Sequence, residues 1–305
     1  MTAAADRSSI APDTGVGVVD LGVRNAERSR DFYRDIVGLE VIEEDGPVRL
    51  GAAGKELVVL HPGALEPAAV GTTGLYHFAI VVPSRREFAR LIARLIALRY
   101  PHGPTDHVMT KSDYFSDPDG NGIEIYAETP EDGTWFMSDD GFWAEDASGA
   151  RRSGRDPIDL RLLLAELPDD DPLDRPLPAG TRMGHVHLHV RDLDEAVHFW
   201  SDLVGFDVMG YSRRFGAAFV SAGGYHHHLG LNTWSGPGAP PPPPGASGLR
   251  HFTVEVPTGA DLREVENRLE QGGVAIAPDD DTGFFAQDPS GNRAHVVAGP
   301  SADVN

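Results

Sequence analysis

The sequence predicts an α+β fold built from four copies of one βαβββ module, and two observations predict it. The segments DFYRDIVGLEV, GLYHFAIVVP and DPDGNGIEIY begin at residues 31, 74 and 117, and they recur as HFWSDLVGFDV, GLRHFTVEVP and DPSGNRAHVV at 198, 248 and 288. The offsets are 167, 174 and 171 residues, so a half of roughly 170 residues is present twice. Each half also holds two strand-like alternating stretches, each followed by an amphipathic helix and further short strands.

The helix boundaries follow from capping residues. Asp192 with Glu195, and Ser84 with Glu87, have the i, i+3 spacing of a capping box, so we expect helices to begin at these positions. Two glycines follow the first helical segment of each half and are expected as the left-handed residues that end it: Gly38 and Gly205.

The helix over 85–98 is expected to bury one apolar stripe, because its apolar residues recur at helical spacing: Phe88, Leu91, Ile92, Leu95 and Ile96. The arginines of this helix are expected on a solvated face. The two Asp-Pro-x-Gly-Asn runs are expected as tight turns that enter the last strand of a module.

These signals divide the chain into two repeats, 15–128 and 182–298. The first holds modules at 16–62 and 74–128, and the second holds modules at 182–234 and 248–298. Residues 1–14 are expected as a flexible polar leader and 299–305 as a tail. The connecting segment 129–181 is unusually long for a link between adjacent units, which is natural if modules two and three must travel to meet one another.

Composition excludes several classes of function. The chain has no cysteine, so disulfides, iron–sulfur clusters and thiol catalysis are excluded, and any metal must be held by His, Asp or Glu. The formal charge of −21 argues against nucleic acid or an acidic membrane face as a partner. The sequence has no apolar run of roughly 18 residues and no apolar region of a signal peptide near its start, so we expect a cytoplasmic protein that acts on a small molecule.

Five segments carry a family resemblance: FYRDIVGLEV, GLYHFAIVVPSRREFARLI, SDPDGNGIEIYAE, GHVHLHVRDLDEA and SAGGYHHHLGLNTW. They resemble the vicinal-oxygen-chelate superfamily of glyoxalases, bleomycin-resistance proteins and extradiol dioxygenases, and look most like its catechol 2,3-dioxygenase-like, four-module members. The resemblance covers nearly everything except 1–14 and 129–181. It implies that two modules pack edge to edge into a cupped eight-stranded mixed sheet with helices outside, and that the chain forms two such sheets.

The resemblance also implies a site shared by two modules. In the ring-cleaving members, one module supplies a first-strand His ligand and a last-strand acid–base His. The other supplies a first-strand His ligand, a nearby second His, a Tyr ten residues before the ligand Glu, and that Glu. Module two matches the second pattern and module three the first, with these residues in order of sequence: His77, His107, Tyr114, Glu124, His185 and His228.

Modules one and four match poorly. Val18 stands where module one would need its first His, and Phe285 and His295 stand where module four would need Tyr and Glu. Pairing module two with module three leaves nothing missing, so we predict that these two meet. His251 is present in module four, and we interpret it and His295 as relics of duplication, although the sequence leaves open a second site.

On this pairing, His77, Glu124 and His185 are the expected metal ligands. Two imidazoles and one carboxylate on one face of an ion suit non-haem Fe(II), with Mn(II) as the next choice. His228 is expected as the general acid and base, because imidazole titrates near neutrality. The remaining expected site residues are two donors of hydrogen bonds to the bound oxygens, Tyr114 and His107, and one substrate-binding residue on the strand face of His185, His187.

Simpler interpretations exist for the histidines. The alternation of His185, His187 and His189 also fits a polar strand face in water. The run from His226 to His228 also fits a polar cluster at the junction of a loop and a strand, and we expect a loop or structural role for His227.

Three functions compete. The leading one is an extradiol-type ring-cleaving dioxygenase that acts on a catechol-like aromatic compound with O₂. The second is a non-redox, glyoxalase-like isomerase or lyase in which His228 becomes a fourth metal ligand. The third is a metal-free resistance protein that binds an aromatic compound. The sequence identifies neither the substrate nor the position of ring cleavage, and it leaves the oligomeric state open, a homo-oligomer included.

Overall fold

The computed structural model describes residues 9–279 and 283–299. Most of the expected leader and tail therefore lies outside the described residues. The described end of the leader differs from the expected flexible segment, because Ile10 is buried and its N–H donates a 2.8 Å hydrogen bond to the carbonyl of Gly205. A single isoleucine in a polar segment has no periodic pattern, so this packing could not be predicted from the sequence.

The order strand–helix–strand–strand–strand occurs four times, as the sequence predicts. The first set is β1 (Gly15–Val23), α1 (Ala26–Phe32) continued by the π-helical turn η1 (Tyr33–Val37), β2 (Glu40–Glu43), β3 (Val48–Ala52) and β4 (Lys55–Pro62). The second is β5 (Gly74–Val82), α2 (Arg85–Leu98), β6 (Gly103–Asp106), β7 (Thr110–Ser116) and β8 (Gly122–Glu128).

The second half repeats this order. The third set is β13 (Arg182–His189), α4 (Leu193–Val197) continued by η3 (His198–Leu203), β14 (Asp207–Ser212), β15 (Ala217–Ser221) and β16 (Leu229–Asn232). The fourth is β17 (Gly248–Val256), α5 (Gly259–Gln271), β18 (Ala277–Asp279), β19 (Gly283–Gln287) and β20 (Arg293–Ala298).

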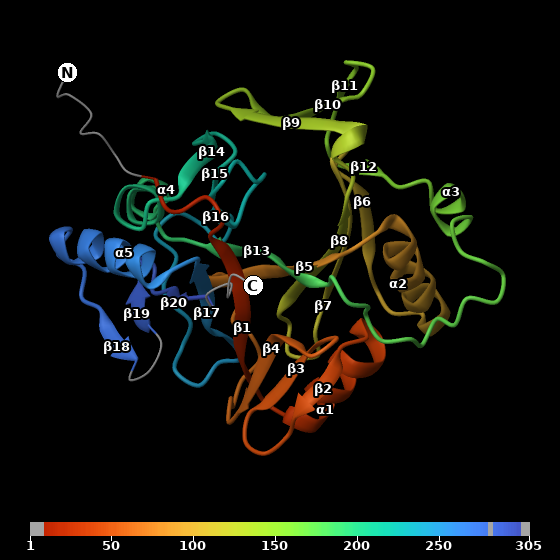
Figure 1. Ribbon diagram of the computed structural model, residues 1–305, viewed down its shortest axis with the longest axis horizontal. Helices are drawn as coiled ribbons and strands as arrows, with labels where there is room; N and C mark the ends of the chain where they lie inside the picture. The colour runs from red at the N-terminus through yellow and green to blue at the C-terminus, as the bar shows by residue number, and fades with distance from the viewer. Residues whose placement is uncertain (1–8, 280–282, 300–305) are drawn as a thin grey trace, which may run out of the picture.

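The strands form two large mixed sheets, and each joins one module from the first half of the chain with one from the second half (Figure 1). One has the order β12-β6-β7-β8-β5-β13-β16-β15-β14, so β5 of the second module pairs antiparallel with β13 of the third. The other has the order β18-β19-β20-β17-β1-β4-β3-β2, so the first and fourth modules pair through β1 and β17. The helices lie on the outside of the molecule in Figure 1. The predicted meeting of modules two and three is therefore observed.

The segment between the two halves has structure of its own. It contains the short turn η2 (Pro130–Asp132), β9 (Gly133–Ser138), β10 (Gly141–Asp146), β11 (Arg151–Arg152), β12 (Asp156–Pro157) and α3 (Leu160–Leu164). Strands β9, β10 and β11 form a small separate sheet, and β9 contacts β14 of the third module at the top of Figure 1. Strand β12 adds to the edge of one large sheet through β6, so that sheet has nine strands where eight were expected.

Helix α2 buries its apolar stripe as expected, with the exception of Ile96, whose side chain is 43% exposed. The prediction of a solvated arginine face is wrong for two residues. Arg90 and Arg94 are buried; Arg90 Nε pairs with Asp171 Oδ1 at 2.9 Å, and Arg94 Nε donates to the carbonyl of Leu173 at 2.6 Å. The acidic stretch near the end of the connecting segment covers this face of the helix, and the Asp171 carboxylate neutralises the charge of Arg90.

The predicted Asp-Pro-x-Gly-Asn turns are observed, and each fixes a helix to a strand. The carboxylates of Asp117 and Asp288 accept backbone N–H groups of their own turns. The same carboxylates accept hydrogen bonds from Tyr33 and Trp200, which occupy equivalent places in the two halves, at 3.0 and 3.3 Å. The predicted caps at Ser84 and Asp192 and the left-handed Gly38 and Gly205 are also present.

No helix in the described part of the chain is both long and apolar enough to cross a membrane.

Candidate metal centre and active-site cavity

Three neighbouring strands place the expected ligands on one face of the nine-stranded sheet. In the centre, Ala79 of β5 is paired with Glu124 of β8 on one side and with His185 of β13 on the other. Paired residues on neighbouring strands project to the same face, and so does His77, two positions before Ala79. Because alanine carries only a methyl group, the Glu124 and His185 side chains meet across it.

The ligand atoms of these residues form a nearly equilateral triangle. His77 Nε2 lies 3.2 Å from His185 Nε2, and Glu124 Oε2 lies 3.1 Å from each of these two nitrogens. All three side chains are buried. Ligands bound at right angles about 2.1 Å from a metal ion lie about 3.0 Å apart, so the donor set fits one divalent ion held on one face.

The protonation states of this group suit metal binding. Burial raises the pKa of the Glu124 carboxyl, but His185 and His77 outweigh burial and hold this pKa well below its usual range. Burial lowers the pKa of His185, so its imidazole is neutral near neutral pH. An ionised carboxylate and a neutral imidazole are the forms that coordinate a metal.

Tyr114 and His107 form a chain of hydrogen bonds beside Glu124. The carbonyl of Gly154 lies 2.5 Å from His107 Nδ1, so this nitrogen carries the proton and donates it. Nε2 of the neutral imidazole then accepts a hydrogen bond from the Tyr114 hydroxyl at 2.9 Å. Burial, and then the charge of Glu124, raise the pKa of Tyr114 well above its usual value, so the phenol stays protonated. Both ring nitrogens of His107 are engaged, so this residue orients Tyr114.

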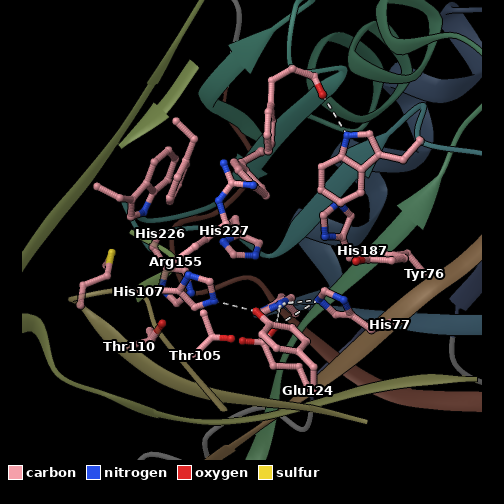
Figure 2. Close-up of a pocket in the computed structure, with 18 residues that line it drawn as sticks. Tyr76, His77, Thr105, His107, Thr110, Glu124, Arg155, His187, His226 and His227 are labelled. Carbon is pink, nitrogen blue, oxygen red and sulfur yellow. Dashed lines mark hydrogen bonds and ion pairs between the residues drawn. The ribbon is translucent and has the colours of Figure 1, made fainter. Parts of the chain in front are cut away.

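A cavity of ≈ 370 Å³ opens onto the triangle, and Figure 2 shows the side chains that converge on it. Polar groups lie around the ligand residues, and aromatic rings form much of the remaining wall: Tyr76, Tyr114, Trp135, Phe142, Phe215, Phe219 and Trp234. A cavity of this size and lining suits a small planar aromatic molecule.

Two comparisons with known proteins identify the family of this chain. The family model described as "Glyoxalase/Bleomycin resistance protein/Dioxygenase superfamily" matches residues 15–125 and 182–296. The chain belongs to this superfamily. A curated relative, the catechol-2,3-dioxygenase of Bacillus subtilis (strain 168), is 40% identical over 286 residues, which cover 92% of this chain and 96% of that protein.

Solved structures share the superfamily fold at low sequence identity. One from Bacillus subtilis subsp. subtilis strain 168 is superposed with a TM-score of 0.64 and 14% identity, covering 97% of this chain and 87% of that chain. Glyoxalase I from Zea mays is superposed with a TM-score of 0.55 and 15% identity, covering 94% and 92%. At these identities the likeness extends to the fold alone.

For one site residue of this superfamily member, the sequence analysis predicted the wrong histidine. His228 does not line the cavity. Its Nδ1 accepts hydrogen bonds from Ser221 Oγ at 2.9 Å and from the Ala222 N–H at 3.2 Å, and burial lowers its pKa to about 4. The preceding residue, His227, lines the cavity, and its ring centroid lies 4.1 Å from that of His185. Residues 226–228 lie just before β16 and are not part of a regular strand, so strand alternation does not determine which of these histidines faces the cavity.

His226 lines the cavity together with His227. The position of His227 therefore differs from the loop or structural role that was expected for it. Burial lowers the pKa of His226 to about 3 and that of His227 well below its usual value. Together with His185 they form a second group of three histidines whose nitrogens lie within 4.8 Å of one another. The uninterrupted run HHH was the available signal, but the start of the following strand could not be fixed from sequence.

His187 lines the cavity as expected and is buried. Its ring lies against Gly230, where a Cβ atom would be 2.7 Å from the imidazole, so the glycine makes room for it. Among the described residues, none gives His187 Nε2 a hydrogen-bond partner. His189 is turned to Asn232, 2.7 Å from Nδ1, and does not line the cavity.

The equivalent place in the other large sheet holds a different cluster. Asp20 lies two residues after Val18 on β1, and its carboxylate contacts His61 Nε2 at 2.6 Å and His251 Nε2 at 3.2 Å. His295 pairs instead with Asp279 at 2.9 Å. Neither His251 nor His295 belongs to a metal-ligand group among the residues that the structure describes.

Sequence reasoning missed three lining residues that come from the connecting segment: Trp135, Phe142 and Arg155. The segment has no counterpart in the repeats, and its short strands carry no clear periodicity, so nothing in the sequence connected it to the site.

Proposed function

We propose that this protein is a non-haem Fe(II)-dependent extradiol dioxygenase that cleaves the ring of a catechol-like aromatic compound with O₂. The observation that carries the proposal is the triangle of donor atoms of His77, Glu124 and His185 at an aromatic-lined cavity. The catechol-2,3-dioxygenase named above, at 40% identity over nearly the whole chain, supports the same reaction class.

The three residues would hold the metal with one carboxylate and two neutral imidazoles. Bound Fe(II) would supply the redox chemistry that O₂ requires, and its residual positive charge would favour ionisation of a catechol hydroxyl. Mn(II) accepts the same donors and is the second choice. The cavity beside the three donor residues would take both hydroxyl oxygens of a catechol.

The other cavity residues would handle protons and orientation. His227 replaces His228 as the proposed general base, because it lines the cavity beside His185, and burial lowers its pKa, so the imidazole is in the neutral form that a base needs. Tyr114 would contact the substrate oxygens, held in place by His107. His187 offers Nε2 as a further polar contact to the substrate.

The test is reconstitution of the metal-free chain with Fe(II) under anaerobic conditions, followed by a screen of catechols in the presence of O₂. We expect one O₂ consumed per yellow ring-opened product. Glu124→Ala should abolish turnover, whereas His251→Ala, the equivalent of His77 in the other sheet, should retain it. Iron-loaded protein that binds catechols but consumes no O₂ would refute the proposal.

The second histidine group favours one alternative. Because His226 and His227 lie within ligand reach of His185, either could add a nitrogen donor to the metal, as in a non-redox glyoxalase-like enzyme. Full activity of the zinc- or nickel-loaded chain without O₂ would establish that alternative.

A further inference from the structure

Arg155 brings a positive charge into the cavity. Among the 18 side chains that line it, Arg155 is the one lysine or arginine, and Figure 2 labels it together with His107, His226 and His227. Its guanidinium carbon lies 4.9 Å from the centroid of the Phe215 ring and 5.8 Å from that of Phe142. The two aromatic rings and the guanidinium therefore belong to one wall of the cavity.

This guanidinium has no anionic partner within the described ranges 9–279 and 283–299. Neither an ion pair nor a hydrogen bond from its nitrogens is present there, although its neighbour Arg152 pairs with Asp146 and Asp156. Several other arginines of the described residues also have no ion pair, Arg151 among them, but Arg155 is the one that lines the cavity. A guanidinium presents five donors in a fixed plane, and these are left for a ligand.

The backbone that carries Arg155 is tied to the candidate metal centre. The preceding residue, Gly154, accepts the hydrogen bond of His107 and has a φ of +68°, which a side chain would strain. A Cβ at Gly154 would also lie 2.6 Å from the Phe142 ring. On the other side, Asp156 begins the pairing of β12 with β6. The backbone at Arg155 is therefore held by contacts that extend to Tyr114, while the residue itself is exposed to solvent along the cavity wall.

We propose that Arg155 binds a carboxylate on the substrate, so that the preferred substrates are catechols with an anionic side chain. The inference deepens the proposed function and rests on it for the catechol part. A planar guanidinium binds a carboxylate through two parallel hydrogen bonds, and stacking on Phe215 and Phe142 holds its plane. The metal centre would take the two hydroxyl groups and Arg155 would take the acid, which fixes the ring from both sides.

Binding and turnover are measured separately with the full chain. Anaerobic titration calorimetry of the Fe(II)-loaded protein compares 3,4-dihydroxyphenylacetate with its methyl ester and with catechol. Steady-state kinetics with O₂ then compare the same three compounds. The variants are Arg155→Gln, Arg155→Lys and a matched control, Arg151→Gln, which removes an arginine stacked 4.6 Å over Trp143 outside the cavity.

We expect the parent to bind the acid about 10- to 100-fold more tightly than the ester, as a charge-assisted pair would give. Arg155→Gln should lose this preference by weakening binding of the acid much more than binding of catechol, Arg155→Lys should keep part of the preference, and Arg151→Gln should keep all of it. Thermal unfolding of each variant checks that the fold is intact.

Two results would overturn the inference: equal affinity of the parent for acid and ester, or an equal loss for acid and catechol in Arg155→Gln. Failure of the proposed function has a different signature. In that case no compound is cleaved by any variant, while the Arg155-dependent preference for the acid in calorimetry still supports the anion site.

Discussion

At the scale of single residues, the site depends on alternation along strands. The resemblance to ring-cleaving dioxygenases pointed to His77, Glu124 and His185, and their positions within recognisable strands put all three on one face. Ala79 explains why they can meet, because it is the small residue between two strands that each carry a ligand. Alternation does not explain the misplaced residue: continued back from Leu229, the pairing of β16 with β13 would set His228 beside His185, but residues 226–228 lie outside the strand and His227 lines the cavity instead.

The exchange of His228 for His227 gives a direct prediction. His227→Gln should lower kcat for a catechol at least about 100-fold, as loss of a general base does, with metal content unchanged. His228→Gln should lower stability by about 1–2 kcal/mol, because its buried bonds to Ser221 and Ala222 are disturbed, and leave kcat within a few fold. Steady-state kinetics and urea unfolding of both variants provide the measurements. A large loss of kcat in His228→Gln alone would contradict this assignment.

At the scale of elements, the structure of the repeats could be predicted from the sequence, and the structure of the connecting segment could not. Caps, turns and the apolar stripe of α2 are local signals, and they are where the sequence placed them. The burial of Arg90 and Arg94 and the entry of Trp135, Phe142 and Arg155 into the cavity depend on how a non-repeated segment folds back over the molecule. Local periodicity carries no information about such long-range contacts.

Strands β6 and β7 give a prediction at this scale, because a buried pair links them. His102 Nδ1, just before β6, lies 2.8 Å from Asp113 Oδ2 on β7. Burial, only partly offset by His102, raises the pKa of Asp113 to about 6 from 3.8. The folded state therefore favours the protonated carboxyl, and the resulting stability is present below pH 3.8 and is lost as pH rises through about 6.

Asp113→Asn removes this titration, so the variant should gain stability relative to the parent between pH 4 and pH 8, by at most about 3 kcal/mol. Urea unfolding at both pH values measures the change, with Asp140→Asn in the exposed β9–β10 turn as the control. A stability difference between variant and parent that is the same at pH 4 and pH 8 would show that Asp113 is not the group responsible.

At the scale of the whole molecule, the duplicated chain forms two sheets of one plan, and among the residues that the structure describes only one sheet carries the donor triangle. The cross-pairing of modules could be predicted because the site residues are divided between modules two and three, while Val18, Phe285 and His295 occupy the corresponding places elsewhere. In the other sheet, the Asp20 carboxylate contacts one ring nitrogen of His61 and one of His251, and no group of metal ligands is found there among the described residues.

The central claim is that His77 and Glu124 of the second module and His185 of the third module bind one metal ion. The most direct test is the iron content of three proteins after anaerobic loading and removal of free Fe(II): the parent, His185→Ala and His251→Ala. We predict one iron per chain in the parent and in His251→Ala, and almost none in His185→Ala. Undiminished iron in His185→Ala, or its loss in His251→Ala, would contradict the account.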